Sequence, residues 1–290
     1  MARQIKPFFS IIIPALNEGK YLPNLLKDLA LQTFTNFEVL VVDGRSTDNT
    51  VEKALSFVSS LPHLTILQSQ KRHVCIQRNL GADQARADWL LFMDADNRLP
   101  VNFLEGIKSQ CLKHNVDILT SWLKPDIENS ANLTYSTIMN IFLELQMNYT
   151  PTFLLEAFFA IKKNVFLKIG KFDETVSYAE GKTLIKKAAL LGFKAKMVRE
   201  PIWTYSFRRI RKYGHLGAAT RVLQLELMDL LGLDKAHNLA NLYPMKGGKY
   251  FDTPKRKKLL RTIEKLLKSE SARKKFIASY KSKLKTFLNT

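Results

Sequence analysis

The sequence predicts an α/β fold in which a mixed, mostly parallel sheet is flanked by helices. Short apolar runs rich in β-branched and aromatic residues alternate with segments whose apolar residues recur every three to four positions. Such alternation builds βαβ units, in which neighbouring strands run parallel. The runs also end in proline or aspartate, at Pro14, Asp43 and Asp94. Open parallel sheets bind their ligands at these carboxyl ends, so we expect the functional residues at that edge.

Six segments have the composition of strands. They cover residues 8–13, 37–42, 64–67, 89–93, 117–122 and 157–161. We expect the first strand to stop at Pro14, because proline has no N–H to donate to a sheet. The five apolar residues of the fourth segment indicate a strand that is buried on both faces.

Helical periodicity appears between these strands. It covers residues 22–29, 51–58, 74–85, 134–148, 163–169, 183–191 and 208–233, with one further helix after Pro100. Ser46, Thr47 and Asp48 are capping residues for the second of these helices. Gly192 is expected to close the helix that it follows.

Composition narrows the class of protein. Of the 290 residues, 46% are hydrophobic and 10% are aromatic, which supports a sizeable core and excludes wholesale disorder. No apolar run approaches the roughly 18 residues needed to span a bilayer, and the first strand follows Met1 too closely for a signal peptide. Cys75 and Cys111 lack metal or redox spacing, so we expect buried, reduced thiols in a cytoplasmic protein.

The net charge of +19 is concentrated at the C-terminus. Residues 254–290 hold 13 Lys and Arg against two Glu, a net charge of +11, and two amphipathic helical patterns meet near 269–271. A helical basic extension over 214–290 is therefore predicted to follow a main domain over 1–213. Such a segment attracts phosphorylated substrates, acidic lipid surfaces or nucleic acid. A solvated basic helix face is an equal alternative.

Asp94 and Asp96 follow the buried strand directly. In extended backbone, residues i and i+2 point the same way, so both carboxylates can face one side. They repel each other unless a cation lies between them, and oxygen ligands with room for water and phosphate suit Mg²⁺ or Mn²⁺. A polar turn that merely ends the strand is an evenly matched alternative.

Four blocks of the sequence resemble family 2 glycosyltransferases. They lie at residues 10–18 (SIIIPALNE), 42–50 (VDGRSTDNT), 78–82 (RNLGA) and 92–96 (FMDAD), in the family's order and spacing. The resemblance covers about residues 8–213. It implies the A-type nucleotide-sugar transferase (GT-A) fold with a DXD motif at 94–96. It also implies a nucleotide-binding half over about 1–123 and an acceptor-side half over about 124–213.

The resemblance assigns nucleoside-binding roles to the first two blocks. The backbone around Pro14 and Ala15, together with Asn17 and Glu18, would border the nucleoside. Asp43 would accept a hydrogen bond from the imide N–H of a uracil-like base. Capping of the following helix is the alternative role for this carboxylate.

Further residues would contact the diphosphate and the metal. Arg78 would lie near the nucleotide, where a guanidinium suits phosphate or base edges, although a surface arginine on a helix is nearly as well supported. Asp94 would hold the ribose or a metal-bound water, and Asp96 the Mg²⁺ or Mn²⁺ that bridges two phosphates. Arg208 and Arg209 would clamp the leaving diphosphate or bind an anionic acceptor or lipid headgroup. An exposed basic helix face is the alternative for these two arginines.

The family supplies its catalytic base from an acidic pair after a Phe-Asp-Glu segment. That segment is present at residues 172–174, and Glu180 takes the first position of the pair, but Gly181 replaces the second acid. Glu180 is therefore the predicted base, which takes the acceptor's proton in a displacement with inversion. A charge favoured by the helix dipole is an equal alternative for it.

Together these features predict a metal-dependent, inverting glycosyltransferase of the hexosyltransferase class. We expect a UDP-sugar donor and a hydroxyl acceptor such as a lipid-linked or polysaccharide glycan. We also expect a cytoplasmic protein in peripheral contact with the anionic inner face of the membrane through 254–290, and no nucleic-acid partner. Two alternatives stay open. They are a catalytically inactive glycosyltransferase-like binding protein, suggested by Gly181, and a basic membrane- or polyanion-binding module, suggested by the charge.

Overall fold

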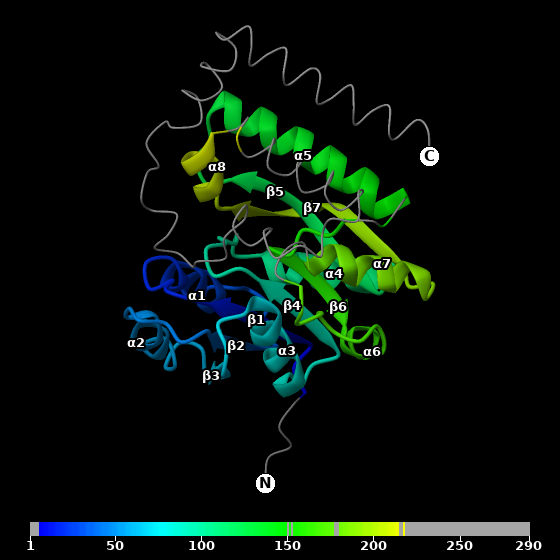
Figure 1. Cartoon of the computed structure of the whole chain (residues 1–290). Helices are drawn as coiled ribbons and strands as arrows, with labels where there is room; N and C mark the ends of the chain where they lie inside the picture. The colour runs from blue at the N-terminus through cyan, green and yellow to red at the C-terminus, as the bar shows by residue number, and fades with distance from the viewer. Residues whose placement is uncertain (1–5, 150, 152, 177–179, 215–216, 218–290) are drawn as a thin grey trace, which may run out of the picture. The chain divides into compact units, whose positions relative to one another are not determined.

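The computed structural model describes residues 6–149, 151, 153–176, 180–214 and 217, all within one compact unit, Met1–Asp252. Seven strands of this part of the chain form one sheet. They are β1 (Phe9–Ala15), β2 (Phe37–Asp43), β3 (Leu64–Gln68), β4 (Trp89–Met93), β5 (Ile118–Pro125), β6 (Phe158–Lys162) and β7 (Ala195–Tyr205). Their order is β3-β2-β1-β4-β6-β5-β7, with β6 antiparallel to both neighbours and every other pair parallel (Figure 1). The predicted mixed, mostly parallel sheet is confirmed.

Helices cover both faces of this sheet. Those in the described residues are α1 (Leu22–Ala30), α2 (Thr50–Leu55), α3 (Val74–Gln84), α4 (Phe103–Lys113), α5 (Ser130–Tyr149), α6 (Lys163–Lys168), α7 (Glu180–Leu190) and α8 (Arg208–Tyr213). The pleat of β1 separates the two faces: Ile11 and Ile13 pack with α1, α2 and α4, whereas Ile12 packs with α3, α6 and α7. Helix α5 packs on β5 and β7.

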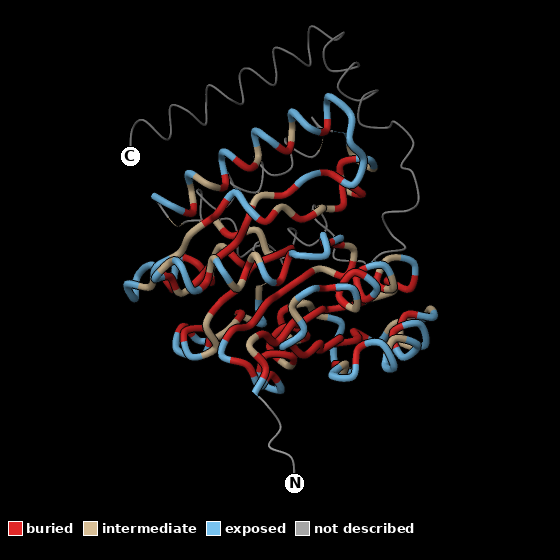
Figure 2. The backbone as a smooth tube through the Cα atoms, turned by 180° about the vertical axis from the view of Figure 1, so that it is seen from behind, coloured by how far each residue is buried: buried red, intermediate tan, exposed pale blue. Residues whose placement is uncertain are grey.

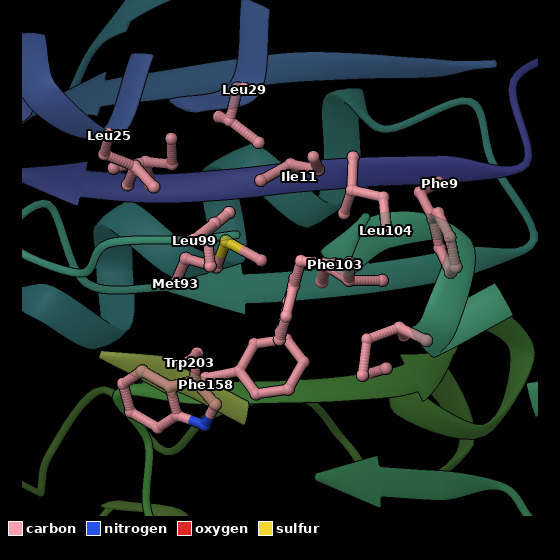
Figure 3. Packing of buried hydrophobic residues seen from close by; sticks show 14 of the residues in the cluster. Phe9, Ile11, Leu25, Leu29, Met93, Leu99, Phe103, Leu104, Phe158 and Trp203 are labelled. Carbon is pink, nitrogen blue, oxygen red and sulfur yellow. The ribbon is translucent and has the colours of Figure 1, made fainter. Parts of the chain in front are cut away.

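The core holds the central strands firmly in place. Figure 3 shows Leu25 and Leu29 of α1 over Ile11 of β1. On the same face, the rings of Phe103 and Phe158 meet edge to face, with centroids 5.0 Å apart. Figure 2 shows buried residues running along the strands and exposed ones on the outer turns of the helices. Burying one such side chain contributes about 1.5–3 kcal/mol, so the strand ends are held in place by many such contacts.

Strand β1 runs through Pro14, contrary to the expectation that it would stop there. Pro14 stays in register with Val42 of β2, while pairing with β4 ends at Ile12. The carbonyl of Ala15 accepts the Gly44 N–H at 2.7 Å on the β2 side. Because backbone groups alternate sides along a strand, the nitrogen of Pro14 faces the β4 side beyond the last paired residue. The missing donor therefore costs no sheet hydrogen bond.

Strand β7 was not predicted from the sequence. Its centre reads Arg199-Glu200-Pro201, which interrupts the apolar pattern, and a proline argues against a central strand. The structure places β7 at the edge of the sheet, and its register with β5 shifts between Ser121 and Leu123. An edge strand with an irregular register tolerates both the charges and the proline.

Several helices differ from the prediction in their bounds. Helix α5 begins at Ser130, four residues before the expected start, and α7 begins at Glu180, three residues before it. Helix α2 begins at Thr50 and ends at Leu55, three residues before the expected end. Of the helix predicted over 208–233, the described residues show α8, after which Gly214 has a φ of 76°. Residues 218–290, including the predicted basic tail helices, lie outside the described residues, and the domain boundary at 213 stays a prediction. No helix among the described residues combines the length and apolar character that crossing a bilayer requires.

The amino-terminal edge of the sheet is held by a buried carboxylate, Glu38. It accepts hydrogen bonds from Ser10 Oγ, from the N–H of Arg86 and from Arg86 Nε, each at 2.6 Å. The hydroxyl of Ser10 in turn accepts the N–H of Ala87 at 3.0 Å. These contacts join β1, β2 and the start of β4, and the hydrogen bonds from Ser10 and Arg86 outweigh burial and lower the pKa of Glu38.

Replacing Glu38 should therefore destabilise the protein in a pH-dependent way. A carboxylate whose pKa is lowered by folding stabilises the fold above its unfolded pKa and loses that contribution as pH falls. We expect Glu38→Gln to lower the free energy of unfolding by about 1.5–3 kcal/mol at pH 7, and by less below about pH 4. Urea unfolding at both pH values measures the difference. Glu52→Gln, an exposed acid on α2, is the control; a Glu38→Gln loss that is equal at both pH values contradicts the assignment.

Candidate active site

The carboxyl ends of β1, β2 and β4 meet at one edge of the sheet, as the sequence predicts. Because β6 is antiparallel to β4, the residues that precede β6 reach the same edge. Helix α8 follows β7 and brings Arg208 to Asp96, 112 residues away in sequence. The edge thus gathers residues from the full length of the described chain.

Asn17 joins the loops that follow β1 and β2. Its φ of 54° lies in the left-handed region, which asparagine tolerates better than most residues. Its Oδ1 accepts the N–H of Thr47 at 2.8 Å, and its own N–H donates to Ser46 Oγ at 2.8 Å. The two loops predicted to border a nucleoside are therefore held together.

Pro14 and Ala15 are the last residues of β1, and Asp43 is the last residue of β2, so they directly precede these loops. Pro14 and Ala15 are buried within β1, and Gln77 of α3 donates to the carbonyls of Ala15 (3.0 Å) and Val42 (2.7 Å). Asp43 is 2% exposed, and its Oδ2 accepts the backbone N–H groups of Arg45 (3.0 Å) and Ser46 (3.1 Å). These contacts hold the loop after β2, several residues before α2 begins at Thr50, so they are not a cap of that helix. The base-binding role of Asp43 stays a prediction.

A buried guanidinium, Arg208, joins Glu18 to Asp96. It lies 2.7 Å from Asp96 Oδ2 and 3.2 Å from Glu18 Oε1, and it stacks on the ring of Tyr21 at 4.1 Å. Burial raises the pKa of Glu18 to about 8, opposed by Arg208 and reinforced by Asp96. Oε2 of Glu18 is buried without a hydrogen-bond partner among the described residues. Arg208 is 7% exposed, so the alternative that it lies on an exposed basic helix face is wrong.

A second buried guanidinium, Arg78, lies on α3. Its Nη1 contacts Glu180 Oε1 at 2.6 Å, and its Nη2 contacts Asp94 Oδ1 at 3.1 Å and the carbonyl of Glu156 at 3.3 Å. Arg78 and Glu180 are each 3% exposed, so a surface role for Arg78 is wrong. Burial raises the pKa of Asp94, opposed by Arg78 and reinforced by Asp96; Arg209 also opposes the rise.

Glu156 is a member of this site that the sequence analysis did not assign. Its Oε1 accepts the N–H of Gly181 at 2.7 Å, and its side chain is half-buried. Burial raises its pKa, and the nearby Glu180 raises it further. The one signal in the sequence was an acidic residue inside the apolar run from Phe153 to Ile161, which by itself does not indicate a site.

The donor atoms at this edge suit a divalent cation completed by its substrate. Among the described residues there is no group of three or more His, Cys, Asp or Glu that could hold a metal alone. Mg²⁺ usually takes one or two carboxylates together with substrate phosphates. The ion pairs use only Oδ1 of Asp94 and Oδ2 of Asp96, which leaves a second oxygen on each aspartate as a hard donor. Burial and the charges of Asp96 and Asp94 raise the pKa of Glu18, so ionised carboxylates are disfavoured here and a bound cation would favour them.

Two sequence comparisons found relatives of this chain. The family model described as "Glycosyl transferase family 2" matches residues 10–172. An uncharacterized glycosyltransferase of Haemophilus influenzae is 30% identical over 203 residues, which cover 67% of this chain and 63% of that protein. The chain thus spans less than two thirds of that relative's length.

Solved structures share the fold at low sequence identity. S. aureus TarS 1-349 in complex with UDP-GlcNAc matches with a TM-score of 0.58 and 21% identity, covering 81% of this chain and 69% of that one. Mannosyltransferase PcManGT from Pyrobaculum calidifontis, in complex with GDP-Man and Mn²⁺, matches with a TM-score of 0.59 and 19% identity, covering 77% and 62%. These likenesses confirm the predicted GT-A fold.

The Arg78–Glu180 pair should behave as a buried ion pair in unfolding experiments. Removing one partner leaves the other charge buried and unpaired, which costs about 3–5 kcal/mol, whereas removing both is far less damaging. We expect Arg78→Met to lose more stability than Arg78→Met/Glu180→Met, as measured by urea unfolding. Lys6→Met breaks an exposed pair with Asp88 and should cost about 0–1 kcal/mol. An Arg78→Met loss no larger than that of Lys6→Met contradicts the burial argument.

Proposed function

This chain belongs to family 2 of the glycosyltransferases, and from this premise we propose that it transfers a sugar from a nucleoside diphosphate sugar to a hydroxyl acceptor. The reaction is a single displacement with inversion at the anomeric carbon. The observation that carries the proposal is the meeting of Asp94, Asp96 and Arg208 at the carboxyl-end edge of a parallel sheet. Acidic residues that hold a cation and a guanidinium that binds phosphate are the two groups that a leaving diphosphate requires.

The nucleoside would lie against the loops after β1 and β2. Asn17 holds these loops together, so they offer a rigid border with the backbone of Pro14 and Ala15 beneath it. A UDP-sugar is the proposed donor, supported by the fold shared with S. aureus TarS, which was solved in complex with UDP-GlcNAc. The GDP-Man in PcManGT makes a guanine nucleotide the comparison that the experiment must include.

Asp94 and Asp96 would hold the divalent cation. When bound, Mg²⁺ or Mn²⁺ neutralises the charge that grows on the leaving diphosphate; Mn²⁺ is present in the PcManGT structure. The protein would orient these carboxylates through two ion pairs: Arg78 holds Asp94, and Arg208 holds Asp96. Arg209, whose charge reaches Asp94, would bind the diphosphate from the same helix.

A binding protein without transferase activity is the second candidate function. The observation that favours it is the position of Glu180, which is 3% exposed and bound to Arg78 at 2.6 Å. A carboxylate enclosed in this way is poorly placed to take a proton from an acceptor hydroxyl. Contact of the basic segment 254–290 with an anionic membrane, and a lipid-linked acceptor brought there, are extensions of the proposal that rest on charge alone.

Donor binding should depend on Asp96. At a hundredfold excess over Kd a ligand stabilises the folded state by about 2.7 kcal/mol, or about 5–10 °C in Tm for a chain of this size. We expect this shift with a UDP-sugar and Mn²⁺ in the wild type, and loss of most of it in Asp96→Asn. A thermal-shift series of UDP- and GDP-sugars, with and without Mn²⁺, measures it.

Asp88→Asn is the matched control for this series. Asp88 precedes β4 at the opposite edge of the sheet, where its side chain is 81% exposed, so this variant should keep the donor-dependent shift. Equal shifts in Asp96→Asn and the wild type contradict the proposed metal and diphosphate site. A shift with GDP-sugars alone contradicts the uridine assignment and leaves the transferase proposal standing.

A further inference from the structure

The loop before β6 brings Glu156 beside the aspartates of the proposed active site. The N–H of Asp94 donates to the carbonyl of Ala157 at 3.0 Å, next in sequence to Glu156. The Nη2 atom of Arg78 contacts both Asp94 Oδ1 and the carbonyl of Glu156. Figure 1 shows β6 running alongside β4, which is the reason that this loop reaches the carboxyl-end edge.

Glu156 differs from the other carboxylates of this edge in its partners. Glu18, Asp94, Asp96 and Glu180 each contact an arginine side chain. Asp43 accepts two backbone N–H groups of the loop that follows it. In the part of the chain that the structure describes, no ion pair involves the carboxylate of Glu156. Its Oε1 is held by the N–H of Gly181, which leaves Oε2 as the proton-accepting atom. The charge of Arg78 lowers the pKa of Glu156, but Arg78 contacts the backbone carbonyl of Glu156 and makes no ion pair with its carboxylate. A carboxylate that is held in place and not ion-paired can serve as a general base.

The glycine at position 181 is what makes room for this carboxylate. A Cβ on Gly181 would lie 2.7 Å from Glu156 Cγ, 2.8 Å from Glu156 Oε1 and 2.7 Å from the carbonyl of Leu154. Real Cβ atoms do not approach so closely, so any side chain at position 181 would displace Glu156. The side chain of Glu156 therefore occupies space that an acidic side chain at position 181 would need.

We propose that Glu156 is the catalytic base of this chain and that Glu180 is a positioning residue, which holds Arg78 against Asp94. This inference rests on the proposed transferase function. The acceptor oxygen forms a bond to the anomeric carbon while the bond from that carbon to the diphosphate oxygen breaks. The bonding electron pair leaves with the diphosphate, and the hydroxyl proton passes to Oε2 of Glu156. Burial and the charge of Glu180 raise the pKa of Glu156, which strengthens it as a proton acceptor.

Nucleotide release from the donor tests the proposal with water as the acceptor. The probe is the UDP- or GDP-sugar that gives the wild type the largest thermal shift in Mn²⁺. We expect Glu156→Gln to lower kcat for release by about 10²–10⁴-fold. Its KM should stay within about threefold of the wild-type value, and its donor-dependent thermal shift within about 2 °C, because the donor site is intact. The amide oxygen of Gln can keep the hydrogen bond from Gly181, so this variant should fold, and Glu128→Gln, an exposed acid, is the control.

Chemical rescue separates a base from a structural residue. Sodium formate should restore release in Glu156→Ala, because a small carboxylate can enter the space left by the side chain, and it should not restore release in Asp96→Ala. Release by Glu156→Gln within threefold of the wild type, or no formate rescue of Glu156→Ala, overturns the assignment. A wild type that binds donor but releases nucleotide no faster than buffer also overturns it. Failure of the whole proposed function is distinct, because the wild type then shows no donor-dependent thermal shift.

Discussion

The buried guanidinium of Arg78 is the contact on which the geometry of the carboxyl-end edge depends. It lies on α3 and contacts Glu180 at the start of α7, Asp94 after β4 and the carbonyl before β6. A buried charge is stable only when its partners are in place, so these three segments cannot shift independently. The stacking of Phe172 at 5.3 Å from the guanidinium adds a fourth segment to this constraint. Arg78 thus helps to fix the positions of Asp94, a candidate metal ligand, and of Glu156 and Glu180, the two candidates for the base.

The two edges of the sheet use buried carboxylates differently. At the amino-terminal edge Glu38 accepts three hydrogen bonds from Ser10 and Arg86, and its pKa is lowered. At the other edge Glu18 keeps a buried oxygen without a partner among the described residues, and its pKa is raised to about 8. The first arrangement stabilises the fold by itself. The second leaves electrostatic strain that a cation or a phosphate-bearing ligand would relieve, as is typical of functional sites.

Local patterns predicted six of the seven described strands because each is short, apolar and bounded by turn residues. The same patterns located the site edge, since Asp43, Asp94 and Asp96 follow strands directly. Strand β7 was missed because Arg199, Glu200 and Pro201 break its pattern. Contacts such as Arg78–Glu180, 102 residues apart, carry no local signal at all. Glu156 was not predicted as a site residue for the same reason. Its proposed role depends on Gly181, which lies beside it only in the folded chain.

The crowding between Gly181 and Glu156 also constrains how sequences of this kind can diverge. A lineage that carries glutamate at position 156 gains nothing from a new side chain at position 181 until the glutamate has been lost. The reverse path meets the same barrier, since a glutamate cannot enter where the neighbouring position is already filled. A side chain at position 181 would also require the carbonyl of Leu154, 2.7 Å from the new Cβ, to move. These two positions should therefore covary among homologues, with glycine at one accompanying an acid at the other.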